Sequence, residues 1–216
     1  YMVKHPTSPF AVFVGHYQNG TDHPFEAWVN GESQPRGLGA LAKTLSMDMR
    51  SQDRGWLKAK LDMLAKTSGQ PFELSLPGAK EPSIVASEVS ALARLVSHRC
   101  EELGYFDNIG ETPLVDAMFS IKEPKSGTDG TLSWTVDVLN PVTGDDFVVF
   151  VKELVLPDGT HRPYSIWLSG DYPDALNGLT RSLSLDMRII DPAWIGKKLR
   201  SLSKFPEPQG DFMAKI

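Results

Sequence analysis

The sequence predicts an α+β fold made of two tandem copies of one unit, a β-hairpin followed by a helical hairpin, with a long helix connecting the two copies. Three observations support this prediction. Blocks of sequence recur at a nearly constant offset. Within each copy, signals for two strands, a turn and two helices follow one another in the same order. Between the copies, apolar residues recur at helical spacing along one segment.

The duplication is clearest in a helical block within each copy. Residues 41–50 read LAKTLSMDMR, and residues 179–188 read LTRSLSLDMR. The segment FAVFV at 10–14 returns as FVVFV at 147–151. A set of six further positions is also repeated in register, with Asp53, Trp56, Lys60, Leu61, Leu64 and Lys66 matching Asp191, Trp194, Lys198, Leu199, Leu202 and Lys204. We place the two copies at about 10–66 and 147–204. The first copy lies within a predicted unit one at 1–78, and the second lies within a predicted unit two at 109–216. The connecting helix lies between these units, at 79–108.

Each copy begins with a predicted β-hairpin. Residues 10–16 form an apolar run that predicts a strand, and residues 25–30 predict the return strand. Asn19-Gly20 lies between them, and Asp158-Gly159 takes its place in the second copy. Both dipeptides are typical of tight hairpin turns.

A helical hairpin is predicted after each β-hairpin. The first helix begins near Leu38, because one stripe at helical spacing is formed by Leu38, Leu41, Ala42, Leu45 and Met49. The second helix begins at Asp53 or Asp191, since aspartate is a common N-cap, and Pro192 suits the first helical position.

The remaining elements connect or extend the copies. Residues 84–103 predict the long connecting helix, and Gly104 suits its C-terminal end. Residues 122–130 predict an exposed loop. The second copy gains an extra leading strand at 132–139, followed by a turn at 141–144.

Composition excludes several classes of protein. The chain has 216 residues, 41% of them hydrophobic, which excludes a disordered or collagen-like chain. A net charge of −5 disfavours nucleic acid as a partner. The single cysteine, Cys100, excludes an internal disulfide and a multi-cysteine zinc site. No apolar run is long enough for a membrane span and no signal peptide is visible, so we expect a cytoplasmic protein without a membrane partner.

A glycine-rich helix start is the first candidate binding site. Arg36, Gly37 and Gly39 resemble a phosphate-binding helix N-terminus, at which arginine would add charge. However, the preceding hairpin does not fit a dinucleotide fold, and the second copy loses the first glycine. The alternative role for Gly39 and Gly178 is close packing of the helices. An anion or a nucleotide therefore remains a candidate ligand.

The repeated motif Asp-Met-Arg offers the second set of candidates. Asp48 and Asp186 could be catalytic carboxylates if they were desolvated. Duplication instead favours structural carboxylates that accept bonds from the next helix or pair with an arginine. Arg50 and Arg188 either pair locally or face a binding partner. On these grounds we predict no catalytic residue.

Other residue types with functional potential receive structural interpretations. The repeated tryptophans, Trp28, Trp56, Trp167 and Trp194, are predicted to pack in the core or between the copies, with stacking on a ligand as the alternative. The five histidines show no metal-binding spacing. Cys100 lies on an apolar helical face and is predicted to be a core thiol.

Several blocks together resemble a known family. They read GHYQNG at 15–20, PFEAWVNG at 24–31, PRGLG at 35–39, LSMDMR at 45–50, TLSWTVDVLNP at 131–141 and LSLDMRIIDPAW at 183–194. They resemble the small second polypeptide, or C-terminal part, of adenosylcobalamin-dependent (class II) ribonucleotide reductases. The unit itself is similar to the TSCPD domain of these enzymes, although the name-giving Thr-Ser-Cys-Pro-Asp sequence and a cysteine-rich tail are absent.

The resemblance implies a partner and a cofactor outside this chain. It implies a non-catalytic accessory module that binds the large catalytic chain, in which adenosylcobalamin would be held. No catalytic or cobalamin-contacting residue can be assigned to this chain from the resemblance. The alternative is a free-standing regulatory module that binds a nucleotide or a protein. An independent enzyme that uses Asp48 and Asp186 is the third possibility.

Overall fold

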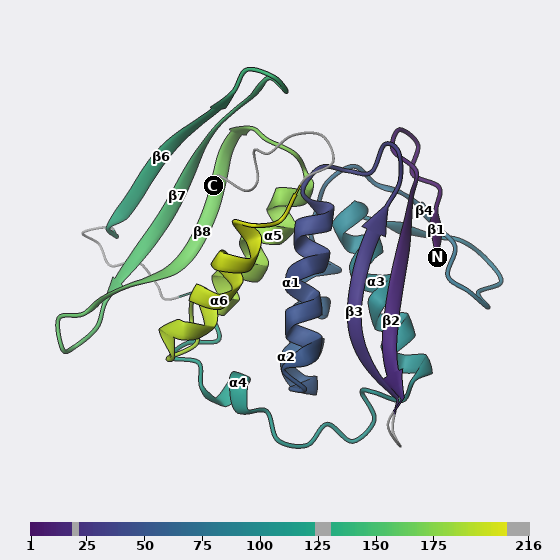
Figure 1. The fold of residues 1–216 in the computed structure, drawn as a ribbon, viewed down its shortest axis with the longest axis horizontal. Helices are drawn as coiled ribbons and strands as arrows, with labels where there is room; N and C mark the ends of the chain where they lie inside the picture. Colours follow the sequence, from purple (N-terminus) through teal and green to yellow (C-terminus); the bar gives the residue numbers. More distant parts are fainter. Residues whose placement is uncertain (19–21, 124–130, 207–216) are drawn as a thin grey trace.

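The computed structural model describes residues 1–18, 22–123 and 131–206, and it confirms an α+β fold with two tandem sheet-and-helix units (Figure 1). Unit one contains β1 (Met2–Val3), β2 (Phe10–Gln18), β3 (Asp22–Asn30), α1 (Leu38–Arg50) and α2 (Arg54–Leu64). Unit two contains β6 (Ser133–Asn140), β7 (Asp145–Val155), β8 (His161–Asp171), α5 (Ala175–Asp186) and α6 (Pro192–Leu202). Between them lie β4 (Phe72–Leu74), β5 (Ser83–Val85), α3 (Glu88–Glu102) and α4 (Pro113–Asp116). In Figure 1, α1, α5 and α6 lie between the two three-stranded sheets.

The two sheets share the same antiparallel register. Phe13 pairs with Trp28 across β2 and β3, and Phe150 pairs with Trp167 across β7 and β8. Each hairpin also has a register shift at the equivalent place, after Gly15 in unit one and after Lys152 in unit two. The sequence repeat is therefore matched by a repeat of strand pairing.

A serine from the first helix of each unit covers the free edge of the neighbouring strand. Ser46 Oγ on α1 lies 2.9 Å from both the amide nitrogen and the carbonyl oxygen of Ala27 on β3. Ser184 Oγ on α5 lies 3.0 and 3.2 Å from the same atoms of Ile166 on β8. An unpaired strand edge exposes backbone groups that need partners, and this serine supplies them for one edge residue in each unit.

The second helix of each unit begins as the sequence predicts. Asp53 Oδ1 accepts a hydrogen bond of 2.7 Å from the backbone N–H of Trp56, and Asp191 Oδ1 accepts one of 2.9 Å from Ala193. Asp53 also accepts a bond of 2.7 Å from the N–H of Leu114, at the first turn of α4. The first cap is therefore buried and shared by two helices, whereas the second is exposed.

Two of the predicted features differ from the structure. A leading strand is not unique to unit two, because β1 pairs with β2; two residues are too few to show an alternating pattern. The connecting helix begins at Glu88 rather than at residue 84, because Ile84 and Val85 pair with β4 and Ser87 caps the helix. The predicted turn at Asn19-Gly20 and most of the loop at 122–130 lie outside the described residues.

The apolar core consists of two unequal clusters. The larger cluster combines β2, β3, α1 and α2 with the apolar side of α3, including Val89, Leu92 and Val96. The smaller cluster is formed by the β7–β8 face, α5 and α6, around Phe147 and Leu183. Among the described residues, no helix takes the place on unit two that α3 takes on unit one. No helix in residues 1–18, 22–123 and 131–206 is long and apolar enough to cross a membrane.

Candidate functional site

Four charged side chains meet in the interior between the two units. The Lys60 ammonium lies 3.1 Å from Asp48 Oδ2 and 2.7 Å from Asp186 Oδ2. The Lys198 ammonium lies 2.5 Å from Asp48 Oδ1 and 2.9 Å from Asp186 Oδ1. All four side chains are fully buried. Each lysine thus joins one carboxylate of its own unit to one of the other unit. We call these residues the Asp–Lys quartet.

The repeated tryptophans complete the quartet. Trp56 Nε1 donates a hydrogen bond of 2.8 Å to Asp48, and Trp194 Nε1 donates one of 2.6 Å to Asp186. The two indole rings meet edge to face at 6.4 Å between centroids. Asp48 and Asp186 lie in the last turn of the first helices, and the tryptophans and lysines lie on the second helices. One duplicated helical hairpin therefore supplies half of the network in each unit.

The quartet balances two negative charges with two positive ones. Burial favours a raised pKa for Asp48, but the ammonium groups of Lys198 and Lys60 outweigh it and lower that pKa. Burial lowers the pKa of Lys60 to about 8, although both carboxylates oppose this shift. For Lys198, burial also acts downward, but Asp186 and Asp48 raise its pKa.

This geometry agrees with a structural role for Asp48 and Asp186, but with other partners than those predicted. Their partners are lysines and indoles, rather than the free N–H groups of the next helix or an arginine. Each carboxylate is enclosed by these donors and has no exposed surface. The recurrence of Lys60 as Lys198 was the sequence signal for the pairing of lysine with Asp48 and Asp186. The pairing itself could not be predicted, because it depends on how the two units face each other.

The predicted anion site is occupied by packing contacts. Arg36 donates two hydrogen bonds, of 2.6 and 2.5 Å, to Asp145 at the start of β7. Gly37 has a positive φ of 86°, and a Cβ there would lie 2.8 Å from Leu176 on α5. A Cβ on Gly39 would lie 3.2 Å from the ring of Phe205. These contacts agree with the packing alternative, and anion binding at this helix start stays a prediction.

The two repeated arginines have different surroundings. Arg50 is exposed; its guanidinium lies 3.6 Å from Glu26 and 4.5 Å from the centroid of the Phe25 ring. Arg188 is buried and donates a hydrogen bond of 2.8 Å to the carbonyl oxygen of Ile121. Only Arg50 therefore has a surface on which it could meet a partner.

The tryptophans of the strands are not core residues, contrary to the prediction. Trp28 is 44% exposed and stacks on Phe13 across the strands, with ring centroids 5.1 Å apart. Trp167 stacks on Phe150 in the same way at 4.9 Å. Both pairs lie on the sheet face that points away from the core, because neighbouring residues along a strand alternate between faces. Trp56 is buried and Trp194 is half-buried, as expected for a tryptophan that packs between the units.

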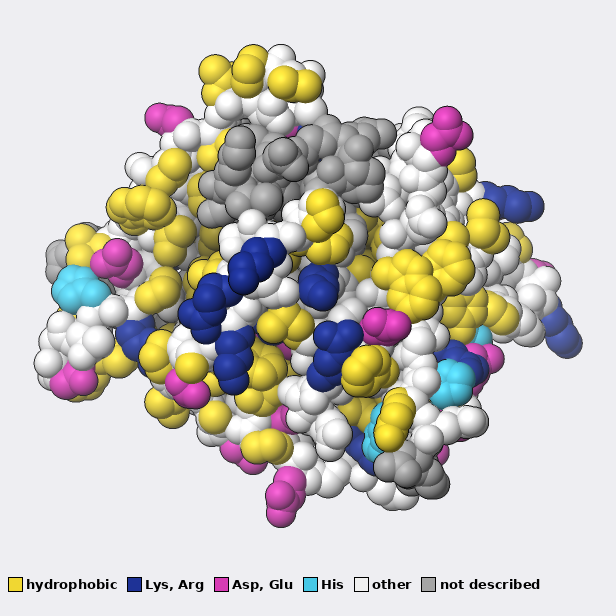
Figure 2. Space-filling view, viewed as in Figure 1, with side chains coloured by type: hydrophobic (Ala, Val, Ile, Leu, Met, Phe, Trp, Pro, Cys, Tyr) yellow, Lys and Arg dark blue, Asp and Glu magenta, His cyan; other side chains and the backbone are white. Residues whose placement is uncertain are grey.

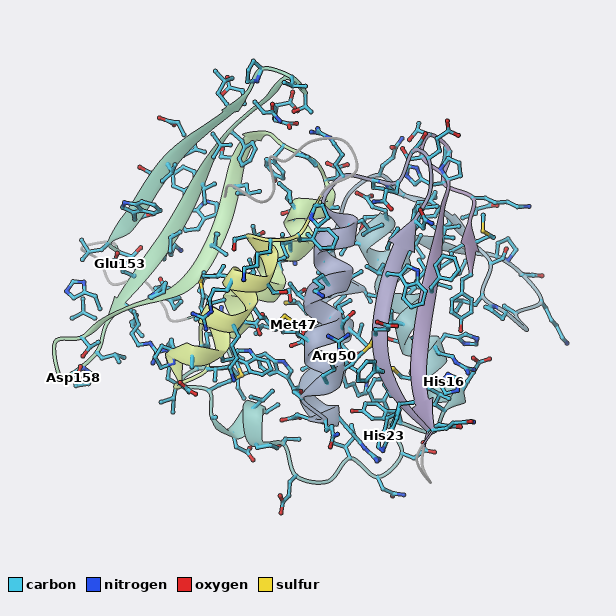
Figure 3. The ribbon with its side chains drawn as sticks, viewed as in Figure 1. His16, His23, Met47, Arg50, Glu153 and Asp158 are labelled. Atoms are coloured by element: carbon cyan, nitrogen blue, oxygen red, sulfur yellow. The ribbon has the colours of Figure 1, made fainter. Side chains whose placement is uncertain are left out.

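Cysteine and histidine supply no metal cluster in the described residues. Cys100 is buried in the larger core, as predicted, and burial raises the pKa of its thiol to about 12. His16 and His23 lie near the far end of the β2–β3 hairpin (Figure 3).

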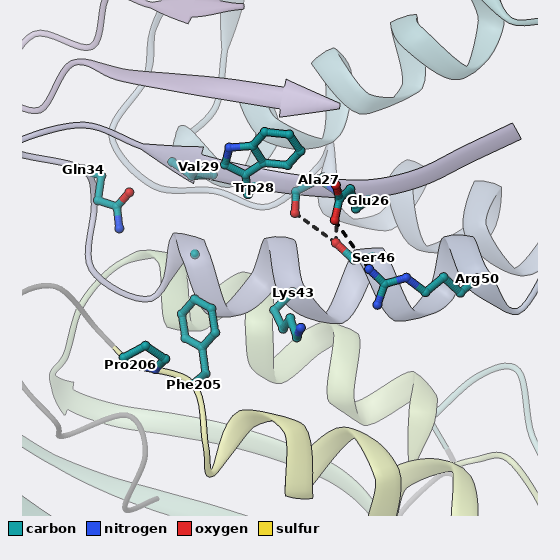
Figure 4. Close-up of a pocket in the computed structure, with 11 residues that line it drawn as sticks. Glu26, Ala27, Trp28, Val29, Gln34, Lys43, Ser46, Arg50, Phe205 and Pro206 are labelled. Carbon is teal, nitrogen blue, oxygen red and sulfur yellow. Dashed lines mark hydrogen bonds and ion pairs between the residues drawn. The ribbon is translucent and has the colours of Figure 1, made fainter. Parts of the chain in front are cut away.

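Two pockets lie beside the helices. The first, of about 460 Å³, lies between β3 and α1 and is lined by Trp28, Lys43, Arg50 and Phe205 among others (Figure 4). The second, of about 370 Å³, lies between β8, α5 and α6. Its lining is mainly apolar and consists of Ala40, Ile166, Leu179, Leu183, Leu199, Arg200, Leu202, Ser203 and Phe205. We call this second pocket the unit-two groove; neither pocket was predicted from the sequence.

Comparison of equivalent positions shows why the unit-two groove is open. Leu199 on α6 is 45% exposed, whereas its counterpart in unit one, Leu61, is completely buried. Ile166 is half-buried, whereas its counterpart Ala27 is buried. In unit one, α3 packs against α2, β2 and β3 and closes this position. The repeat therefore leaves an apolar groove on one unit that an internal helix fills on the other.

No protein-family model, curated protein or solved structure matches this chain.

Proposed function

We propose that this chain is a non-catalytic accessory module that binds a larger catalytic chain. The observation that carries the proposal is the open unit-two groove, in which Leu199 is 45% exposed at a position that is fully buried in unit one. An apolar groove on an otherwise well-packed unit is typical of a protein-binding surface. The sequence resemblance suggests that the catalytic chain is an adenosylcobalamin-dependent ribonucleotide reductase.

The chemistry of ribonucleotide reduction supports an accessory role. That reaction uses one cysteine to form a thiyl radical and a pair of cysteines as the reductant. This chain has one cysteine, Cys100, and burial raises its pKa to about 12, so the thiolate is scarcely populated. We therefore propose that the reacting cysteines and the adenosylcobalamin belong to the partner chain.

Co-purification with the large reductase chain of the same organism tests this proposal. We expect the two purified chains to elute together in size-exclusion chromatography, and we expect this chain alone to form no deoxyribonucleotide when given adenosylcobalamin, a dithiol and a ribonucleotide. Separate elution at micromolar concentrations would contradict the proposal. So would turnover by the isolated chain that is lost in Cys100→Ser.

A nucleotide-binding role is the second candidate, and the first pocket favours it. Lys43 and Arg50 line a pocket that also exposes Trp28, so the pocket offers an aromatic surface and positive charge, which Glu26 beside Arg50 offsets in part (Figure 4). Titration with ATP, followed by tryptophan fluorescence, tests this role. Saturable binding that is lost in Lys43→Ala would support it, and no signal up to millimolar ATP would oppose it.

A further inference from the structure

The unit-two groove can be compared position by position with a site whose occupant is known. In unit one, the residues equivalent to its lining are Ala27, Leu41, Leu45, Leu61 and Leu64, and all of them are buried in the core that includes α3. In unit two, the matching residues Leu179 and Leu183 are buried, but Ile166 and Leu199 keep exposed surface. The groove therefore has the lining of a helix-binding site.

The contacts of α3 show what such an occupant provides. Its apolar side places Val89, Leu92 and Val96 in the core of unit one. Its first turn is fixed to the end of α2, because Ser90 Oγ donates a hydrogen bond of 2.7 Å to the carbonyl oxygen of Ala65. The counterpart of Ala65 is Ser203, which lines the groove. An amphipathic helix of about the length of α3 therefore suits the same place on unit two.

The charge around the groove indicates the polar chemistry of the occupant. On α6 and just after it, Lys197, Arg200 and Lys204 are exposed. Figure 2 shows lysine and arginine side chains gathered over α6 and α1, with hydrophobic side chains between them. At the position of Arg200, unit one has Asp62. This basic rim stands out on a chain with a net charge of −5 and favours a partner with acidic side chains.

We propose that an amphipathic helix of the partner chain, aliphatic on one face and acidic at its edges, docks in the unit-two groove in the place that α3 holds on unit one. This inference rests on the proposed function, because it assigns the helix to the catalytic chain. The aliphatic residues would recur at helical spacing and cover Ile166, Leu199 and Phe205, and the acidic residues would face Arg200.

Affinity measurements with the purified large reductase chain test the inference. We compare the full chain with Leu199→Glu, with Arg200→Glu and with Ile84→Glu. Ile84 is the matched control, because it is also an exposed aliphatic residue but lies on β5, away from the groove. We expect Leu199→Glu to raise the dissociation constant by about tenfold or more, because it places a charge at the centre of the contact. Arg200→Glu should raise it by about threefold or more, and Ile84→Glu should leave it unchanged.

The other outcomes separate this inference from the proposed function. Equal binding by the wild type and by Leu199→Glu would overturn the groove assignment and leave the accessory role standing. No binding by any form of the chain would overturn the accessory role and with it the inference. A dimer of the wild type that Leu199→Glu converts to a monomer would make a second copy the occupant, contrary to the inference. The inference would also be contradicted if a chain truncated after Pro206 lost binding to the partner while Leu199→Glu still bound it like the wild type.

Discussion

At the scale of single residues, Cys100 shows how burial controls chemistry. Its pKa is raised to about 12 from an ordinary value of 9.0, so its thiolate fraction at pH 8 is roughly a thousandfold lower than in an exposed cysteine. We expect almost no reaction of the native chain with Ellman's reagent at pH 8 and full reaction in denaturant. Cys100→Ser should lower the free energy of unfolding by about 1–2 kcal/mol. Complete labelling of the native chain within minutes would show that this thiol is accessible.

The two helix caps offer a matched pair of substitutions. Asp191 is exposed and accepts one capping bond, so Asp191→Ala should cost about 0.5–1 kcal/mol of stability. Asp53 is buried and accepts bonds from both Trp56 and Leu114, so Asp53→Ala should cost about 2 kcal/mol or more. Urea unfolding of both variants provides the measurement, and equal losses would show that the contact with Leu114 contributes nothing.

At the scale of elements, α3 makes the two second helices unequal. Leu61 is fully buried beneath it, so Leu61→Ala should lower the free energy of unfolding by about 2–5 kcal/mol. Leu199, at the same place on α6, is 45% exposed, and Leu199→Ala should cost about 1 kcal/mol or less. Urea unfolding of the isolated chain compares the two variants. A large loss in Leu199→Ala would mean that the chain itself covers the groove.

Part of this fold could be predicted from the sequence, for reasons visible in its elements. The repeat fixed the order of the hairpins and helices, and the caps at Asp53 and Asp191 are local signals. The exposure of Leu199 could not be predicted, because Leu61 is the same residue type in the same pattern and only the three-dimensional position of α3 separates them. The outward position of Trp28 was missed because a core tryptophan and a cross-strand stacked one have the same neighbours in sequence.

At the scale of the whole molecule, the Asp–Lys quartet joins the two units. Lys60 of unit one contacts Asp186 of unit two, and Lys198 contacts Asp48 in return. A buried ion pair contributes little relative to apolar packing, but loss of one partner leaves a buried charge without compensation. The quartet therefore favours one way of pairing the units, since a shifted arrangement would bury unpaired charge.

A double-mutant cycle tests the balance of the quartet. Lys60→Met alone should cost about 3–5 kcal/mol, because two carboxylates then share one ammonium group. Adding Asp186→Asn restores neutrality and keeps an oxygen as acceptor for the indole of Trp194, so the double variant should be more stable than Lys60→Met. Urea unfolding of the wild type, of Lys60→Met, of Asp186→Asn and of the double variant completes the cycle, and strictly additive losses would show that these charges are not coupled.

Hydrogen–deuterium exchange of this chain, alone and with the large reductase chain, measures whether the partner occupies the unit-two groove. We expect slower exchange in α6 and in β8, which border the groove, with no change in α3, which is already packed on unit one. Protection confined to unit one, or no protection of this chain at saturating partner, would show that the groove does not bind the reductase chain.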